Sequence, residues 1–259
     1  MIKHVFIFIA ILFTAWACSP QEEELTRDFN SGWLFFPEDD SLAFSVDFPD
    51  STWRQLDLPH DWSIEGTFSE DNPTEPSGGA LPAGIGWYRK SFTLENVTGE
   101  KVFIDFDGVY RNSEVWINGH YLGKRAYGYS SFSYDLTPYL EPAGEDNLIA
   151  VRVDNSLQPN SRWYTGSGIY RNTWLRIVPE IHIEKWGIFV TTPQITKELA
   201  VIKAEISIEN EKEPDSAAEI NAWIIDSHGK KVSDRAKSNV TNNMASLEIA
   251  LMNPELWDI

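Results

Sequence analysis

Histidines, cysteines, serine motifs and glycine-rich loops are the features that most often hold metals, nucleophiles or phosphates. The histidines are His4, His60, His120, His182 and His228, and the single cysteine is Cys18. None of these histidines has metal-ligand spacing to another histidine or to the cysteine. The chain also has no phosphate-binding loop and no Gly-x-Ser-x-Gly segment. The sequence therefore predicts no metal site, no cofactor and no serine nucleophile.

Paired carboxylates are the other route to catalysis, as a general acid and a general base. From composition alone, Glu65, Glu114 and Glu141 are candidates for such a pair. A working pair needs rigid elements that hold both groups at a fixed separation across the reacting bond. These glutamates lie among short predicted strands and turns, so we predict that this chain contains no catalytic residue.

The charge balance excludes one class of partner. The 259 residues include 39 acidic and 21 basic side chains, a net charge of −18. Phosphate backbones need lysine and arginine for neutralisation, so we predict no nucleic-acid partner. The chain is rich in aromatic residues, with 11 Trp, 9 Tyr and 14 Phe, which suits β-sheet cores and sugar-facing surfaces. A neutral glycan fits this composition better than a polyanionic one.

Residues 1–17 predict a signal peptide. A short basic start with Lys3 precedes residues 5–17, which are apolar apart from Thr14. This apolar stretch is too short to span a bilayer and has the length of a signal-peptide core. Cys18 follows a small-residue segment that resembles a bacterial lipobox, so we predict that Cys18 is lipidated. Ordinary signal cleavage and an uncleaved anchor are the alternatives.

An acidic linker, residues 18–26, is predicted to follow the lipidated cysteine. Its run of three glutamates, residues 22–24, is read either as a surface-export signal or as a solvated linker. These features predict an exported lipoprotein of a Gram-negative bacterium, in the periplasm or on the outer membrane or cell surface. The lipid anchor would be its contact with the membrane.

The elements of residues 27–179 are predicted to be short strands joined by turns. Residues 102–106 alternate as a half-buried strand, and Ile149, Val151 and Val153 share one face of another. Asn118-Gly119 lies between two strand-like runs and predicts a type I′ hairpin turn, because both residues tolerate positive φ. There is no long amphipathic helix. This pattern predicts a jelly-roll sandwich.

Residues 180–259 predict a second β-unit. Apolar residues alternate with polar ones at Ile202, Ala204, Ile206 and Ile208, at Ile220, Ala222 and Ile224, and at Leu247, Ile249 and Leu251. We predict an immunoglobulin-like sandwich, truncated relative to the ~100 residues usual for that fold. An incomplete sandwich exposes a sheet edge, which is an aggregation hazard. The predicted fold class is all-β, a jelly-roll (galactose-binding-like) sandwich followed by an incomplete immunoglobulin-like β-sandwich.

Six segments carry a resemblance to a known family. They are residues 27–33 (RDFNSGW), 58–66 (LPHDWSIEG), 84–90 (GIGWYRK), 108–119 (GVYRNSEVWING), 127–132 (YGYSSF) and, after residues 155–156 (NS), 162–171 (RWYTGSGIYR). Their order and spacing resemble the N-terminal region of glycoside hydrolase family 2, in particular its bacterial β-galactosidase branch. The second unit is similar to the family in position and strand pattern.

The resemblance implies a jelly-roll sugar-binding domain, then an immunoglobulin-like domain, then a catalytic (β/α)8 barrel. Family members are retaining enzymes that need two glutamates about 5–5.5 Å apart, both in the barrel. None of the carboxylates in this chain matches either glutamate. We therefore expect the non-catalytic N-terminal part of a β-galactosidase-like hydrolase of oligosaccharides or polysaccharides. Its catalytic barrel would be missing from this chain.

The resemblance also implies that loops of the first domain wall the terminal sugar subsite. In many relatives, an aspartate six residues before the glycine of Gly-Ile-x-Arg contacts sugar hydroxyls. Here that glycine is Gly168, and Arg162 stands in the aspartate position. An arginine fork can also donate to hydroxyls, so Arg162 is a predicted substrate-binding residue.

Two neighbours complete the predicted sugar site. Asp61 is expected to supply the carboxylate, since a charged acceptor pairs well with vicinal hydroxyls, and Trp163 to stack on the apolar face of a sugar. The alternatives are that Asp61 caps a turn and that Trp163 lies in the core.

Two other functions stay open from the sequence. One is a free-standing carbohydrate-binding surface lipoprotein, and the other is an adhesion or scaffold protein. The terminal sugar is also open, because the family contains β-glucuronidases and β-mannosidases. Residues 59–62 (PHDW) favour a galactosidase.

Overall fold

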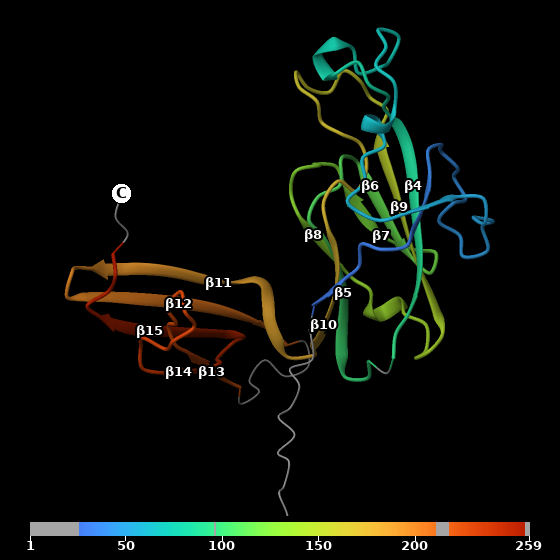
Figure 1. Cartoon of the computed structure of the whole chain (residues 1–259). Helices are drawn as coiled ribbons and strands as arrows, with labels where there is room; N and C mark the ends of the chain where they lie inside the picture. Colours follow the sequence, from blue (N-terminus) through green and yellow to red (C-terminus); the bar gives the residue numbers. More distant parts are fainter. Residues whose placement is uncertain (1–25, 96, 211–217, 257–259) are drawn as a thin grey trace, which may run out of the picture.

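The structure is a computed structural model that describes residues 26–95, 97–210 and 218–256. The predicted signal peptide, Cys18 and nearly all of the predicted linker lie outside these ranges. Figure 1 shows two lobes, one from residue 26 to about residue 179 and a second from there to the C-terminal end. All regular structure is strand apart from three short 3-10 helices, η1 (Ser63–Glu65), η2 (Pro76–Gly78) and η3 (Thr137–Tyr139), within the described ranges.

Two antiparallel sheets form the first lobe. The larger has six strands in the order β3-β2-β4-β9-β6-β7, and the smaller has four in the order β1-β10-β5-β8. Their bounds are β1 (Thr26–Asp28), β2 (Trp33–Phe36), β3 (Arg54–Leu56), β4 (Gly84–Thr93), β5 (Glu100–Phe106), β6 (Ser113–Ile117), β7 (His120–Arg125), β8 (Phe132–Asp135), β9 (Asp146–Asn155) and β10 (Thr173–Pro179).

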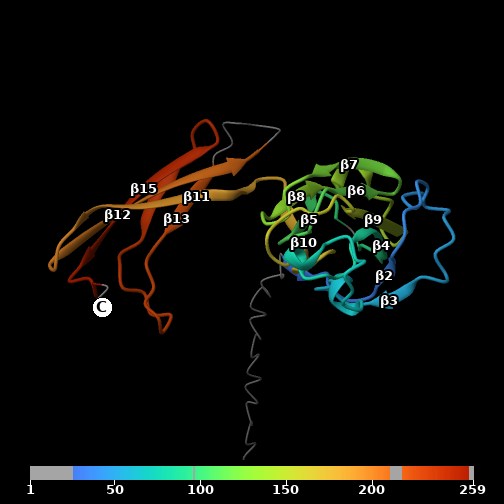
Figure 2. The same ribbon diagram turned by 90° about the horizontal axis from the view of Figure 1, so that it is seen from above.

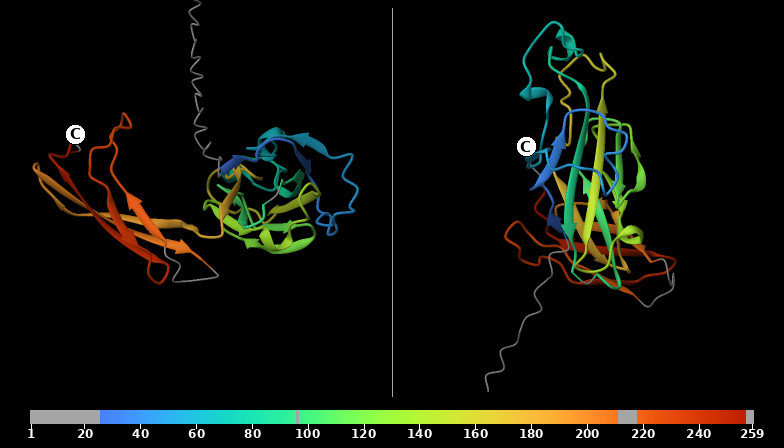
Figure 3. Two further views of the ribbon diagram at one scale, coloured as in Figure 1. Left: turned by 90° about the horizontal axis from the view of Figure 1, so that it is seen from below. Right: turned by 90° about the vertical axis from the view of Figure 1, so that its right-hand side faces the viewer.

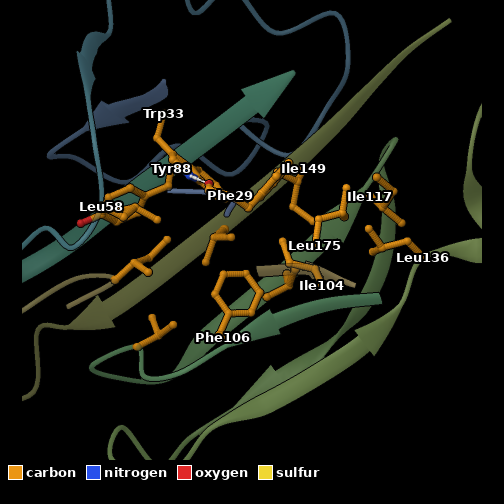
Figure 4. Close-up of a cluster of buried hydrophobic side chains, with 14 of the residues drawn as sticks. Phe29, Trp33, Leu58, Tyr88, Ile104, Phe106, Ile117, Leu136, Ile149 and Leu175 are labelled. Atoms are coloured by element: carbon orange, nitrogen blue, oxygen red, sulfur yellow. Dashed lines mark hydrogen bonds between the residues drawn. The ribbon is translucent and has the colours of Figure 1, made fainter. Parts of the chain in front are cut away.

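The core of this lobe lies between the two sheets. Figure 4 shows Trp33, Tyr88 and Ile149 from the larger sheet beside Ile104 and Phe106 from the smaller one. The face predicted for the strand around residue 150 is confirmed, because Ile149, Val151 and Val153 are all fully buried. The first lobe is thus an all-β sandwich, as predicted.

The predicted hairpin turn is also confirmed. Asn118 and Gly119 join β6 to β7 and have φ of 48° and 78°, as a type I′ turn requires. The Asn118 side chain accepts a hydrogen bond from the Leu148 amide at 2.7 Å and donates one to Asn147 Oδ1 at 2.9 Å. These bonds tie the turn to the start of β9.

The burial of β5 differs from the prediction of a half-buried strand. All five residues from 102 to 106 are buried, including Asp105 on the face away from the core. Arg176 lies 4.4 Å from the centre of the Phe103 ring and donates to Asp105 at 3.1 Å. Lys185, from the second lobe, reaches the same carboxylate at 2.7 Å. Side chains from distant segments therefore cover the outer face of β5.

The second lobe contains a three-stranded antiparallel sheet and a hairpin. The sheet has the order β11-β12-β15, and the hairpin pairs β13 with β14. Their bounds are β11 (His182–Ile195), β12 (Leu199–Glu209), β13 (Glu219–Ala222), β14 (Ala236–Asn239) and β15 (Met244–Met252). Ile224, predicted to continue the pattern of Ile220 and Ala222, lies two residues beyond β13. Figure 2 shows the two lobes side by side, joined where β10 leads into β11.

The hairpin covers only part of the three-stranded sheet. Ile206 and Ala204 of β12 are buried against it, together with residues of β15. Ile188 and Val190 of β11 pair with Ile206 and Ala204, so they share that face, yet each is 55% exposed. The apolar face of this sheet is therefore bare along β11.

Candidate functional site

Two long loops extend from the end of the first lobe that is remote from the second lobe. One joins β3 to β4, the other joins β9 to β10, and Figure 3 shows them projecting together. Backbone hydrogen bonds connect them, from the His60 amide to the Ile169 carbonyl at 2.8 Å and from the Trp62 amide to the Ser167 carbonyl at 3.1 Å. The loops thus form one continuous surface.

Gly168 explains why the second loop passes so close to the sandwich. Its φ is +131°, and a Cβ there would lie 2.4 Å from the Tyr88 hydroxyl and 2.6 Å from the His60 carbonyl oxygen. The Gly168 amide and carbonyl also exchange hydrogen bonds with Tyr110, both at 2.9 Å. A side chain at this position would therefore separate three segments that meet here.

Asp61 fastens the two loops to each other. One carboxylate oxygen accepts hydrogen bonds from the amides of Ser63 at 3.0 Å and Ser167 at 2.8 Å. The other accepts a short hydrogen bond from the Tyr164 hydroxyl. Partial burial, and then the bond to Asp61, raise the pKa of Tyr164 well above its ordinary value, so this hydroxyl stays a donor. These are the contacts of a turn-capping residue, and the contact of Asp61 with a sugar stays a prediction.

A pocket of about 540 Å³ opens beside these loops. Its lining comes from the segments after β5, after β7 and after β9, namely Tyr110, Arg111, Ala126, Tyr127, Gly128, Tyr129, Asn160, Ser161, Arg162 and Trp163. Two of the three predicted sugar-site residues, Arg162 and Trp163, are therefore brought together. Asp61 is not part of this lining.

Aromatic side chains dominate the mouth of the pocket. Trp163 is 61% exposed and donates from Nε1 to the Tyr129 hydroxyl at 3.2 Å. The Tyr129 ring in turn contacts the rings of Tyr110 and Tyr127, at centroid distances of 5.2 and 5.7 Å. Trp163 is not a core residue, so the alternative of a core role is wrong. An exposed aromatic group of this kind can stack on the C–H face of a sugar.

The pocket contains two arginine side chains among its polar groups. Of its two arginines, Arg162 is exposed and Arg111 is partly buried, with an Nε atom that is itself buried. Guanidinium groups can only donate, so both suit the oxygen atoms of a hydroxylated or anionic ligand. The sequence did not single out Arg111, Tyr127 or Tyr129, although all three lie in the quoted segments.

The described residues contain no cluster of three or more histidine, cysteine or acidic side chains that could hold a metal. In the same ranges, no helix has the length and apolar composition to cross a membrane.

The chain is similar in sequence to members of one enzyme family. Residues 15–179 match the family described as glycosyl hydrolases family 2, sugar binding domain. The chain is 46% identical over 246 residues to the beta-galactosidase BoGH2A of Bacteroides ovatus, covering 93% of this chain and 28% of that protein. It is 31% identical over 261 residues to a beta-glucuronidase of Formosa agariphila, covering 91% of this chain and 26% of that protein.

A solved structure gives the same result. The crystal structure of a beta-glycosidase from Bacteroides vulgatus superposes with a TM-score of 0.84 at 42% identity, covering 90% of this chain and 30% of that one. The chain thus spans less than a third of the length of these relatives, and its match is to their N-terminal part. The chain belongs to glycoside hydrolase family 2.

Proposed function

We propose that this chain is the sugar-facing, non-catalytic part of a retaining β-galactosidase-like enzyme that hydrolyses terminal β-linked sugars. The pocket at the loop end of the first lobe carries the proposal. It combines an exposed tryptophan with an arginine, and it lies in the segment that matches a sugar-binding domain. The 46% identity to a beta-galactosidase favours galactose as the terminal sugar.

Trp163 and Arg162 have separate roles in this proposal. The exposed ring of Trp163 stacks on the apolar face of the sugar, and the Arg162 guanidinium donates to its hydroxyl groups. Asp61 holds Tyr164 and the amide of Ser167, so it keeps the loop in place beside the pocket.

The chemistry itself is assigned to a barrel outside this chain. Two of the three candidate glutamates, Glu65 and Glu114, are held in ion pairs within the first lobe. Glu65 is paired with Arg54 at 2.8 Å, and Glu114 with Arg152 at 3.3 Å. Such ion pairs engage the carboxylates with neighbouring arginines inside the lobe and give them a structural role.

The domain organisation is part of the proposal. We assign residues 27–179 to the sugar-binding sandwich and residues 180–259 to an immunoglobulin-like sandwich, supported by the sheet and facing hairpin of the second lobe. Export by residues 1–17 and lipidation of Cys18 are proposed from the sequence. Mass spectrometry of the protein from membranes tests the anchor, because a diacylated Cys18 peptide is expected.

Calorimetry with lactose tests the sugar site. We expect the full chain to bind, and Trp163→Ala to weaken binding about fivefold to tenfold, because it removes one stacking contact. Trp186→Ala is the matched control, since Trp186 is 82% exposed on β11 and far along the chain from the pocket. Equal affinity of wild type and Trp163→Ala would contradict the assignment. Turnover of a nitrophenyl galactoside by the purified chain would contradict the non-catalytic role.

The second candidate is a free-standing carbohydrate-binding surface lipoprotein. It is favoured by one observation, that every residue lining the pocket belongs to the first lobe. Sequencing the DNA directly after the codon for residue 259 separates the two, because the first proposal expects a barrel sequence there.

A further inference from the structure

A second pocket lies on the same lobe and shares no residue with the first. Its volume is about 410 Å³, and its walls include Phe35, Pro37, Trp62 and Pro82, with Arg54 and Glu65 as its charged groups. A mainly apolar wall with a few placed polar groups is typical of a site for a small ligand.

Arg54 and Glu65, the charged groups of this pocket, are held in place by hydrogen bonds to each other and to the buried residue His60. Arg54 Nη2 lies 3.0 and 2.8 Å from the two carboxylate oxygens of Glu65, and 2.8 Å from Nε2 of His60. Nε2 also lies 3.3 Å from Glu65 Oε1, but the Arg54 contact is shorter and a guanidinium only donates, so we assign Nε2 as the acceptor and place the His60 proton on Nδ1. Nδ1 then donates to the Tyr88 hydroxyl at 2.7 Å. His60 is 8% exposed and Tyr88 is fully buried, so the pair rests on the core.

Both charged groups keep capacity for a ligand. The side chains of Arg54 and Glu65 are 51% and 43% exposed. The hydrogen bonds of Arg54 to the described residues all come from Nη2, which leaves Nε and Nη1 as donors for a ligand. Each carboxylate oxygen of Glu65 can accept more than one hydrogen bond. The Arg54 guanidinium thus provides hydrogen-bond donors directly beside the Glu65 carboxylate, which provides acceptors.

Two almost buried aromatic rings lie behind the pocket. Phe35 is 3% exposed and Trp62 is 8% exposed, and the Arg54 guanidinium lies 5.5 Å from the centre of the Phe35 ring. The rings of Phe35 and Trp62 stack at 5.6 Å with an interplanar angle of 27°. Both belong to the buried core, so they cannot swing away. Gly66 packs so closely on Pro82 that a Cβ would lie 2.2 Å from the proline Cγ. Glycine at this position therefore brings the two walls together.

We propose that this second pocket is a carbohydrate-binding subsite that receives one pyranose ring of a neutral glycan. The apolar face of the ring meets the Pro37 and Pro82 walls beside Trp62, and the Arg54 and Glu65 pair bridges two adjacent hydroxyls. An adjacent donor and acceptor match a hydroxyl pair, because each hydroxyl both donates and accepts. The two charges cancel locally in a chain of net charge −18, which favours a neutral sugar over an anionic one. The subsite does not depend on the first pocket.

Indole ¹⁵N–H signals of the full chain provide the test, with methyl β-galactoside and methyl β-glucoside as probes. Trp62→Phe and Trp163→Phe assign the two indole signals. We expect the Trp62 signal to shift on titration with at least one of these sugars, and to shift equally in Trp163→Ala. Glu65→Gln and Arg54→Gln should each weaken this binding at least about tenfold, because each removes a charge-assisted hydrogen bond. Glu219→Gln, which breaks an exposed ion pair in the second lobe, is the control and should leave the titration unchanged.

Three results would overturn the subsite. One is an unshifted Trp62 signal at saturating concentrations of both sugars. Another is a Trp62 shift that survives in Glu65→Gln and Arg54→Gln with unchanged affinity. The third is a Trp62 shift that disappears in Trp163→Ala, because the signal would then report the first pocket. Loss of the Trp163 response alone counts against the proposed function and leaves this subsite standing.

Discussion

Arg89 is the most deeply buried charged side chain of the first lobe, with an exposed fraction of 2%. Its guanidinium donates to Asp50 at 2.7 Å and to the carbonyl oxygens of Ala43 and Ser45 at 2.6 and 2.8 Å. One side chain of β4 thereby fixes the segment between β2 and β3. That segment contributes Trp53 to a second, outer aromatic cluster.

Arg89→Met is expected to lower the free energy of unfolding by about 3–5 kcal/mol, because it leaves Asp50 and two carbonyl groups without their donor. Urea unfolding followed by tryptophan fluorescence measures this. Lys237→Met removes an exposed ion pair and is the control, with no resolvable change expected. An Arg89→Met protein as stable as wild type would show that the guanidinium does not hold the segment.

His60 makes stability depend on pH. Burial, partly opposed by Glu65, lowers the pKa of His60 below its ordinary value of 6.5. The unfolded chain therefore binds the His60 proton more readily than the folded chain does. The free energy of unfolding is therefore expected to fall as the pH drops from 6.5 toward the lower pKa of His60 in the folded state. Below that pKa, His60 causes no further change.

Urea unfolding between pH 5 and pH 8 checks this sign. His60→Gln should flatten the dependence in this window, because glutamine does not titrate. The carboxylates with lowered pKa, including Glu65 and Asp105, lose their contribution only as the pH falls below about 4.5, so they do not mask the effect. A wild-type slope retained in His60→Gln would assign the dependence to another group.

Residues that act through local geometry were predictable from the sequence. Asn118 is an example, since an Asn-Gly pair between two strands needs no tertiary information. Trp163 was placed in the sugar site through a family resemblance, and the alternative of a core role was settled only by its exposure. Arg111 and Tyr129 depend on three loops meeting, which no local pattern encodes. The contacts of Arg54 with His60 and Glu65 could not be predicted from the sequence for the same reason.

The loops between β3 and β4 and between β9 and β10 act as one element. Gly168 sets their separation, because its missing Cβ leaves room for the Tyr88 hydroxyl and the His60 carbonyl. The strands themselves were predictable from the alternation of apolar and polar residues along the sequence. The burial of β5 was not, because Lys185 and Arg176 cover Asp105 from segments distant in the sequence.

Gly168→Ala should therefore destabilise the first lobe by more than about 2 kcal/mol, through backbone strain and a steric clash together. Gly144→Ala separates the two causes. Gly144 also has positive φ, at +84°, but a Cβ there meets no atom within 4 Å. Thermal unfolding of both variants gives the comparison. Equal losses of stability would mean that backbone strain, and not the close approach of the loops, decides the effect.

At the scale of the whole molecule, Asp105 forms a polar junction between the two lobes. Asp105 of β5 binds Lys185 of β11 at 2.7 Å while it also holds Arg176 and Ser133 within the first lobe. Burial opposes the ionised form, but the hydrogen bonds from Lys185 and Ser133 hold the pKa of Asp105 below its ordinary value. The carboxylate is thus charged at neutral pH and links the lobes.

Lys185→Met is expected to loosen this junction. Small-angle X-ray scattering should show a larger radius of gyration and a broader distance distribution than wild type, because the lobes then sample more orientations. Lys185→Arg keeps the charge and should restore the wild-type profile. An unchanged profile for Lys185→Met would mean that other contacts set the orientation of the lobes.

The exposed strand β11 has a consequence for how copies of this chain could pair. The sheet of the second lobe, as far as the structure describes it, has two different free edges, β11 and β15. Pairing β11 with β11 across a twofold axis gives a closed dimer, in which the Ile188 and Val190 side chains of the two copies lie side by side on one continuous sheet face. Pairing β11 of one copy with β15 of the next repeats without closing, so each added chain offers the same edge again. The second arrangement is a filament, and its growth is limited only by the supply of chains.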